Sequence, residues 1–199
     1  MRIAAVTAAA GLFLAPVAGA ASAATHTTPK ALHIVRGTTH VVTVPGIAGA
    51  LLSHGIVPIA TAPATGSLLG GGAAVKFNFP VTGGSVGVLP PRGHINHRGG
   101  ILFFADVHHT VLLRNFVINL RPRTLTAIAT IPGKGSHRVA VFRLDLSHAV
   151  IHHSFTSVRV ANIGLKLTAP AAGVLDAVLR TDVFTPGMKV AVASTSLHL

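Results

Sequence analysis

The stretch Val75-Lys76-Phe77-Asn78-Phe79-Pro80-Val81 alternates apolar and polar residues, with the apolar ones at every second position. A period of two places these apolar side chains on one face of a β-strand, and that face needs a hydrophobic core. The same alternation, complete or partial, recurs in residues 124–131, 142–146 and 163–167. The pattern therefore predicts a mainly β protein.

Glycine-containing segments separate the strand-like stretches. They are Thr82-Gly83-Gly84, Gly99-Gly100 and Pro132-Gly133-Lys134-Gly135. Glycine enters positive φ without steric cost, so the Gly83-Gly84 and Gly99-Gly100 pairs are expected in turns. Residues 61–73, which contain three consecutive glycines, are expected to form a mobile loop. Short strands at this spacing predict an antiparallel β-sandwich or barrel-like domain.

Two short segments have helical character. Residues 47–55 follow a Pro-Gly pair and carry two adjacent leucines. Residues 170–181 begin with a proline, which suits a first helical turn, and space their apolar residues as one helix face requires. Strand-like runs flank both segments, so the fold is expected to contain two strand–helix–strand units around an all-β middle.

The N-terminus has the features of a secretory signal peptide over residues 1–23. Arg2 precedes an apolar stretch, residues 3–17, and Ala21-Ser22-Ala23 supplies the small residues of a cleavage site. An uncleaved N-terminal anchor is the alternative. Residues 24–37 are then expected to form an N-terminal arm and residues 38–199 a single β-rich domain. We expect a secreted or cell-envelope protein with no transmembrane span after the signal is removed.

The chain is basic and rich in histidine. It has 16 lysines and arginines against 4 acidic residues, a net charge of +12 with neutral histidines, 13 histidines and no cysteine. Such an excess favours acidic partners, here anionic cell-surface polymers, or another envelope protein. Specific nucleic-acid binding is not expected, because Trp and Tyr are absent and most Phe residues occupy core-facing positions.

No pattern in the chain predicts catalysis. The pentapeptide Gly83-Gly84-Ser85-Val86-Gly87 matches the nucleophile motif G-x-S-x-G, but Pro90-Pro91 follows and forbids the helix that the motif requires. We therefore expect it to form a hairpin turn. Asp145, Ser147 and His148 lie on one strand-like segment and form no relay by sequence alone. We predict no catalytic residues and no enzymatic activity.

The histidines are the remaining candidates for a binding site. His94 and His97 are three residues apart, which places them on opposite faces of a regular strand, and His108 and His109 are adjacent. With no Cys and no Glu in the chain, no specific metal site is predicted. These four histidines are nevertheless the candidate ligands if the protein carries haem or a metal.

Several segments resemble a known group of proteins. They are residues 79–84, 93–103, 115–116, 125–127 and 142–146. They resemble exported actinobacterial β-rich proteins of unknown function and, more distantly, are similar to the HtaA-type haem-uptake domain. The resemblance implies a β-sandwich with two short helices and surface haem binding through a tyrosine. This chain has no tyrosine, so no residue here takes that role.

These observations together predict a non-enzymatic, secreted or cell-envelope β-domain that acts as a binding or structural protein. No cofactor is expected in that case. The alternative is a haem or metal carrier that uses surface histidines.

Overall fold

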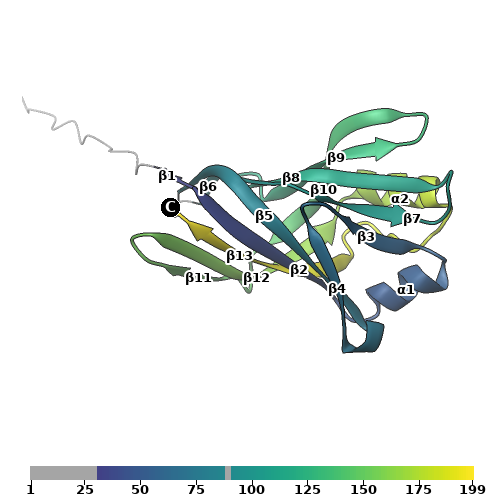
Figure 1. The fold of residues 1–199 in the computed structure, drawn as a ribbon, viewed down its shortest axis with the longest axis horizontal. Coiled ribbons are helices and arrows are strands. Elements are labelled where there is room, and N and C mark those ends of the chain that lie inside the picture. The colour runs from purple at the N-terminus through teal and green to yellow at the C-terminus, as the bar shows by residue number, and fades with distance from the viewer. Residues whose placement is uncertain (1–30, 88–90) are drawn as a thin grey trace, which may run out of the picture.

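The computed structural model describes residues 31–87 and 91–199, and strands dominate them (Figure 1). The strands are β1 (Leu32–His33), β2 (Arg36–Thr43), β3 (Val57–Thr61), β4 (Thr65–Leu69), β5 (Ala74–Gly87), β6 (Arg92–His97), β7 (Gly100–Phe104), β8 (Thr110–Asn119), β9 (Thr124–Ile131), β10 (Gly135–Asp145), β11 (Val150–His153), β12 (Ser157–Leu167) and β13 (Lys189–His198). The helices are α1 (Ile47–Ser53), α2 (Ala169–Leu179) and a short 3₁₀ turn, η1 (Gly70–Gly72). Both α-helices lie where the sequence predicts them.

Eight of the strands close into an antiparallel barrel. Around the ring their order is β5, β2, β13, β12, β10, β9, β8 and β6, and β6 pairs back to β5. The first and last long strands in the sequence, β2 and β13, are direct neighbours in the ring. They pair from Thr43↔Ala191 to Arg36↔His198. The prediction of a mainly β, barrel-like antiparallel domain with two short helices is confirmed.

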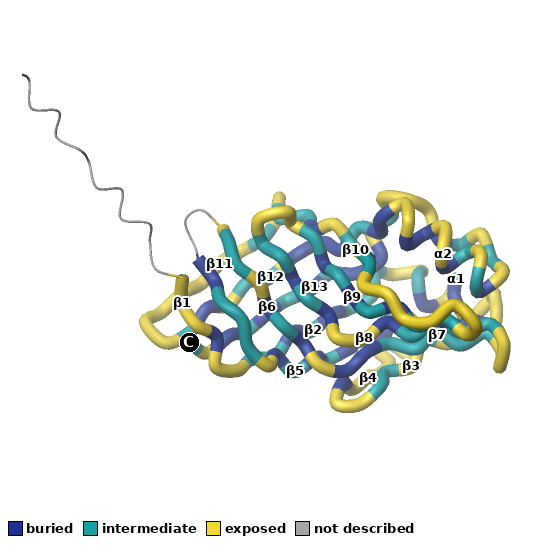
Figure 2. Tube along the Cα trace, turned by 90° about the horizontal axis from the view of Figure 1, so that it is seen from above, coloured by how far each residue is buried: buried dark blue, intermediate teal, exposed yellow. Residues whose placement is uncertain are grey.

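The barrel interior is filled by the apolar faces that the alternation predicted. Phe77, Phe79 and Val81 of β5 are each at most 5% exposed. Phe79 packs edge-on against Phe116 of β8, with ring centroids 5.1 Å apart. Buried and exposed residues alternate along most of the ring strands (Figure 2). The absence of disulfides leaves this burial as the main source of stability.

The remaining strands extend the ring at its edges. β7 pairs with the first half of β8 and with β3, while β4 pairs with the first part of β5. β11 pairs with β12 and forms a hairpin at the end of the barrel that also carries β1 and the C-terminus (Figure 1). No helix in the described residues has the length and apolarity to cross a membrane.

Two predicted loop features are wrong. Residues 65–69 form strand β4, because their backbone pairs with the edge of β5; all five are exposed, so no alternation marks them. Gly83 and Gly84 lie inside β5 at a register shift, with φ of 146° and 131°, where β5 turns from pairing with β2 toward β6. The G-x-S-x-G stretch is thus strand and not a hairpin turn. Of the other predicted turn pair, Gly99 lies in the connection between β6 and β7 with φ of 86°, as predicted, whereas Gly100 begins strand β7.

The predicted signal peptide, residues 1–23, lies outside the described residues. The predicted N-terminal arm is described from residue 31 onward, and there it includes β1 and the start of β2. Ile34, between these strands, is 1% exposed and belongs to the core.

Gly93→Ala tests how closely the backbones of β5 and β6 approach each other. Gly93 has φ of 100°, and a Cβ there would overlap the carbonyl oxygen of Ser85. We expect a loss of about 3 kcal/mol or more in the free energy of unfolding, measured with urea. Gly173→Ala is the matched control. It lies inside α2 with space for a Cβ, so it should stabilise the protein by about 0.5–1 kcal/mol. Equal stability of the two variants would contradict this account.

Candidate ligand-binding pocket

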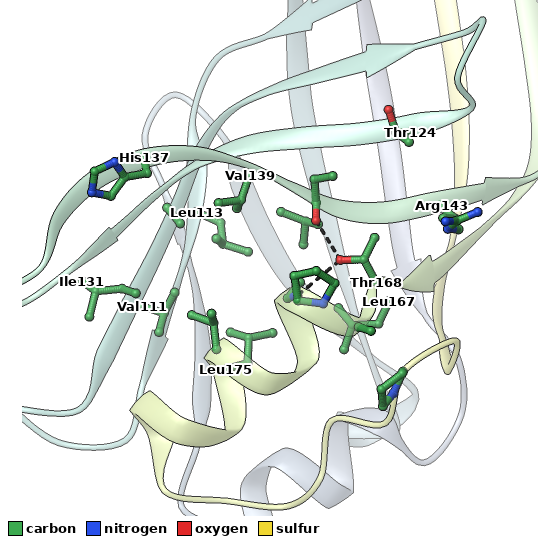
Figure 3. A pocket seen from close by; sticks show the side chains of 18 of the residues that line it. Val111, Leu113, Thr124, Ile131, His137, Val139, Arg143, Leu167, Thr168 and Leu175 are labelled. Atoms are coloured by element: carbon green, nitrogen blue, oxygen red, sulfur yellow. Dashed lines mark hydrogen bonds between the residues drawn. The ribbon is translucent and has the colours of Figure 1, made fainter.

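The barrel opens where β10 leaves β12. In the described chain β10 pairs with β9 from Gly135 to Arg143, but with β12 only from Phe142 to Asp145. A bulge between Ala140 and Phe142 marks the point of departure. The chain leaves β12 at Leu167 and enters α2, which lies below the unpaired edge of β10 (Figure 3).

Thr168 joins α2 to this edge. Its hydroxyl donates to the carbonyl of Ala140 at 2.7 Å, and its backbone N–H donates to the carbonyl of Val141 at 3.0 Å. The same hydroxyl oxygen accepts from the N–H of Ala171 at 3.3 Å and so caps the helix N-terminus. One residue, through its hydroxyl and its backbone N–H, therefore begins α2 and satisfies the backbone carbonyls where the β-ladder stops.

A cavity of about 980 Å³ lies between α2 and strands β8, β9 and β10. This volume is at the upper end of the usual range for small-molecule sites. The wall is mainly apolar; it includes Val111, Leu113, Ile131, Val139, Leu167, Val174 and Leu175 (Figure 3). Val174 is 41% exposed, which places it where the pocket meets solvent.

Basic side chains complete the lining. Lys134 lies in the β9–β10 turn, and His137 and Arg143 lie on β10; all three are exposed. Figure 3 shows His137 and Arg143 on opposite sides of the cavity. No aspartate is among the lining residues of the described chain. The pocket thus combines an apolar interior with positive or ionisable groups at its margin.

His97, one of the four predicted histidines, is buried inside the barrel. Its Nε2 accepts from the Thr39 hydroxyl at 2.7 Å, and Thr39 accepts from the Thr195 hydroxyl at 2.9 Å. Its Nδ1 donates to the carbonyl of Phe116 at 3.2 Å, because a carbonyl can only accept. Both ring nitrogens are therefore occupied, and His97 joins β6 to β2, β13 and β8.

Burial lowers the pKa of His97 from 6.5 to about 4, although hydrogen bonds to the backbone oppose this change. His97 is therefore neutral at physiological pH, and its role in the structure is that of a core hydrogen-bonding group.

The other three predicted histidines are separate from His97 and from the pocket. His94 is exposed on the outer face of β6, as its three-residue spacing from His97 predicted. His108 and His109 lie in the β7–β8 loop, where His109 Nδ1 is 2.6 Å from Asp106 Oδ2. That hydrogen bond is the main reason that the pKa of Asp106 falls to about 2. No group of three or more potential metal ligands occurs in the described residues.

Asp145 and Ser147 form a local turn. Asp145 Oδ1 accepts from the Ser147 hydroxyl at 2.7 Å, and its Oδ2 is 2.8 Å from Lys166 Nζ. These contacts, with Lys166 first, hold the pKa of Asp145 well below its usual range. Asp145 thus contacts Ser147 and Lys166 and stabilises the end of β10. This local role accounts for the closeness of Asp145 and Ser147 that the sequence shows.

Sequence reasoning missed the pocket and His137. The available signal was Thr168 before Ala169-Pro170, a helix start that directly follows a strand. The bulge in β10 depends on tertiary packing and leaves no mark in the sequence.

The fold and pocket define a closed antiparallel barrel with a helix packed beside a gap in the ladder. This architecture is similar to that of the C-terminal domain of HtaA from Corynebacterium glutamicum, with a TM-score of 0.59, 18% identity, and coverage of 84% of this chain and 98% of that one. A histidine-to-alanine variant of the same domain, solved as a domain-swapped dimer, matches with a TM-score of 0.51 and 18% identity over 77% of this chain and 93% of that one. No protein-family model and no curated protein matches the chain.

The buried His97 makes stability depend on pH. In the unfolded chain His97 becomes protonated below about pH 6.5, whereas in the folded chain it stays neutral until the pH approaches 4. Between these values the unfolded state binds more protons, so the free energy of unfolding falls as the pH falls. We expect the loss at pH 4 to be about 3 kcal/mol, measured by urea unfolding at a series of pH values. His97→Gln cannot titrate and should show a correspondingly shallower slope. Parallel slopes for the two proteins would contradict the assignment.

Proposed function

We propose that this protein is an extracytoplasmic, non-enzymatic binding protein that holds an apolar ligand with an acidic group in the pocket beside α2. The observation that carries the proposal is the cavity of about 980 Å³, with its apolar wall and basic margin. The similarity of the fold to the HtaA domain and the sequence features of a signal peptide support it.

The chemistry of the lining favours such a ligand. Val139, Leu167 and Leu175 offer apolar surface, and transfer of apolar groups from water to such a surface is favourable. Lys134 and Arg143 would pair with an acidic group that stays near solvent, where its desolvation cost is small. The ligand would therefore enter apolar end first.

Filling the pocket should abolish binding. We propose titrating the apolar fluorescent anion 8-anilinonaphthalene-1-sulfonate into the protein. Val174→Trp should raise the Kd at least tenfold, because the indole would occupy the cavity. Arg143→Gln should raise it about fivefold by removing one charge contact.

Leu52→Trp is the matched control for the filling variant. Leu52 is 51% exposed on α1, and it does not line the pocket. Its Kd should equal that of the unchanged protein. If Val174→Trp bound the probe as well as Leu52→Trp did, the pocket would not be the binding site.

Haem is a second candidate, favoured by the position of His137. The residues present fit a haem: the cavity is large and apolar, His137 offers an imidazole, and Lys134 and Arg143 suit carboxylates. When bound, the iron would supply a coordination site for the imidazole. The carrier hypothesis from the sequence named His94, His97, His108 and His109, and none of these lines the pocket.

A haem titration distinguishes haem binding in the pocket, through His137, from haem binding at the histidines that the sequence suggested. If the pocket binds haem, the protein should give a Soret shift that His137→Ala removes and His94→Ala leaves intact. No shift with the unchanged protein would reject haem binding. Loss of the shift in a variant of His94, His108 or His109, with His137→Ala unaffected, would place haem on the exposed histidines and contradict the pocket assignment.

A further inference from the structure

The end of the barrel opposite the two helices carries an exposed apolar group. Phe155, at the turn of the β11–β12 hairpin, is 106% exposed, and Val35, between β1 and β2, is 67% exposed. Backbone hydrogen bonds join the two regions: Val35 N–H donates to the His198 carbonyl, and Leu199 N–H donates to the Thr156 carbonyl. We call Leu32, Val35, Arg36, Phe155 and Arg159 the hairpin-end surface.

Nothing in the fold requires these side chains to be exposed. Phe155 follows Ser154 in a turn that is held without the ring, because Ser154 and Ser157 bond each other through backbone and hydroxyl groups. Leu32 is 41% exposed on β1, although Ile34, two residues later, is fully buried. Phe155, Val35 and Leu32 are exposed at the same end of the barrel, and exposed apolar side chains that are grouped in this way are typical of a surface that contacts something apolar.

The polar residues of the same region are basic. Arg36 and His198 are cross-strand neighbours on β2 and β13, and Arg159 and His152 are cross-strand neighbours on β12 and β11. Arg36, His152, Arg159 and His198 are all exposed. The surface thus combines an apolar tip with flanking arginines.

The acidic residues lie elsewhere. Asp106 is in the β7–β8 loop, Asp176 is in α2 and Asp182 follows α2, all toward the opposite end of the barrel (Figure 1). The fourth, Asp145, is paired with Lys166. The hairpin-end surface therefore contains arginines and no aspartate, so a negative surface would attract it.

We propose that the hairpin-end surface docks the protein on an anionic lipid bilayer. A bilayer interface accepts both features at once, because aromatic and aliphatic side chains enter the boundary of the acyl chains while arginines pair with headgroups. A hydrated anionic polymer would pair with the arginines but would provide no apolar surface for Phe155 and Val35 to contact. Docked in this way, the barrel holds the α2 pocket on the side away from the membrane (Figure 1).

The test is sedimentation with vesicles of phosphatidylglycerol and phosphatidylcholine, compared with phosphatidylcholine alone. Every variant keeps the same N-terminal segment, so its contribution is common to all. The protein should bind the anionic vesicles and release with salt. Arg36→Gln with Arg159→Gln should weaken binding by roughly fivefold per charge, and Phe155→Ser should weaken it at least fivefold.

Matched controls lie at the other end of the barrel. Val107→Ser removes an apolar side chain that is 75% exposed, and Arg180→Gln with Lys189→Gln removes two exposed charges. Both controls should bind vesicles like the unchanged protein. Circular dichroism melts confirm that each variant is folded.

Three outcomes would overturn the proposal. The first is equal binding to neutral and anionic vesicles. The second is equal loss in the control and hairpin-end variants. The third is loss with the arginine variant but not with Phe155→Ser, together with displacement by soluble polyphosphate, which would assign the surface to an anionic polymer. Each readout is independent of the probe titration, so failure here leaves the pocket proposal standing.

Discussion

The pocket exists because the ladder between β10 and β12 stops after four paired residues and Thr168 takes over its hydrogen bonds. A strand edge that ends inside a barrel leaves backbone carbonyls facing an apolar space, which is costly unless they find donors. The hydroxyl and N–H of Thr168 supply those donors at Ala140 and Val141. Helix α2 can then lie apart from β9 and β10 and leave the cavity between them. The ring of strands stays closed through the four paired residues of β10 and β12.

His97 satisfies a comparable set of buried polar groups inside the barrel. A polar group at the meeting point of β2, β6, β8 and β13 must have every donor and acceptor satisfied, and the chain from Thr195 through Thr39 to the Phe116 carbonyl does this. Neutral imidazole is the form that fits, since it donates from one nitrogen and accepts at the other. The same fit makes His97 unsuitable as a ligand for an external group.

The sequence predicted the features that depend on local pattern. Alternation at Val75–Val81 located the interior face of β5, and the apolar spacing after Pro170 located α2. The opposite faces of His94 and His97 also followed from strand geometry. The features that the sequence could not predict depend on contacts between distant segments. Strand β4 is fully exposed and shows no alternation, and Gly83-Gly84 bends a strand where a turn was expected. The pocket arises from one bulge at residues 140–142.

The pairing of β2 with β13 sets the order of events in folding. Arg36 of β2 pairs with His198 of β13, so the ring of eight strands stays open until β13 has joined it. Such contacts span nearly the whole chain, and topologies of this kind form slowly and late. Closure of the barrel therefore waits until β13, the ring strand most distant from β2 in the sequence, has been made. Before β13 joins the ring, the edges of β2 and β12 that it will cover carry unpaired backbone groups, and those edges can pair with another extended segment.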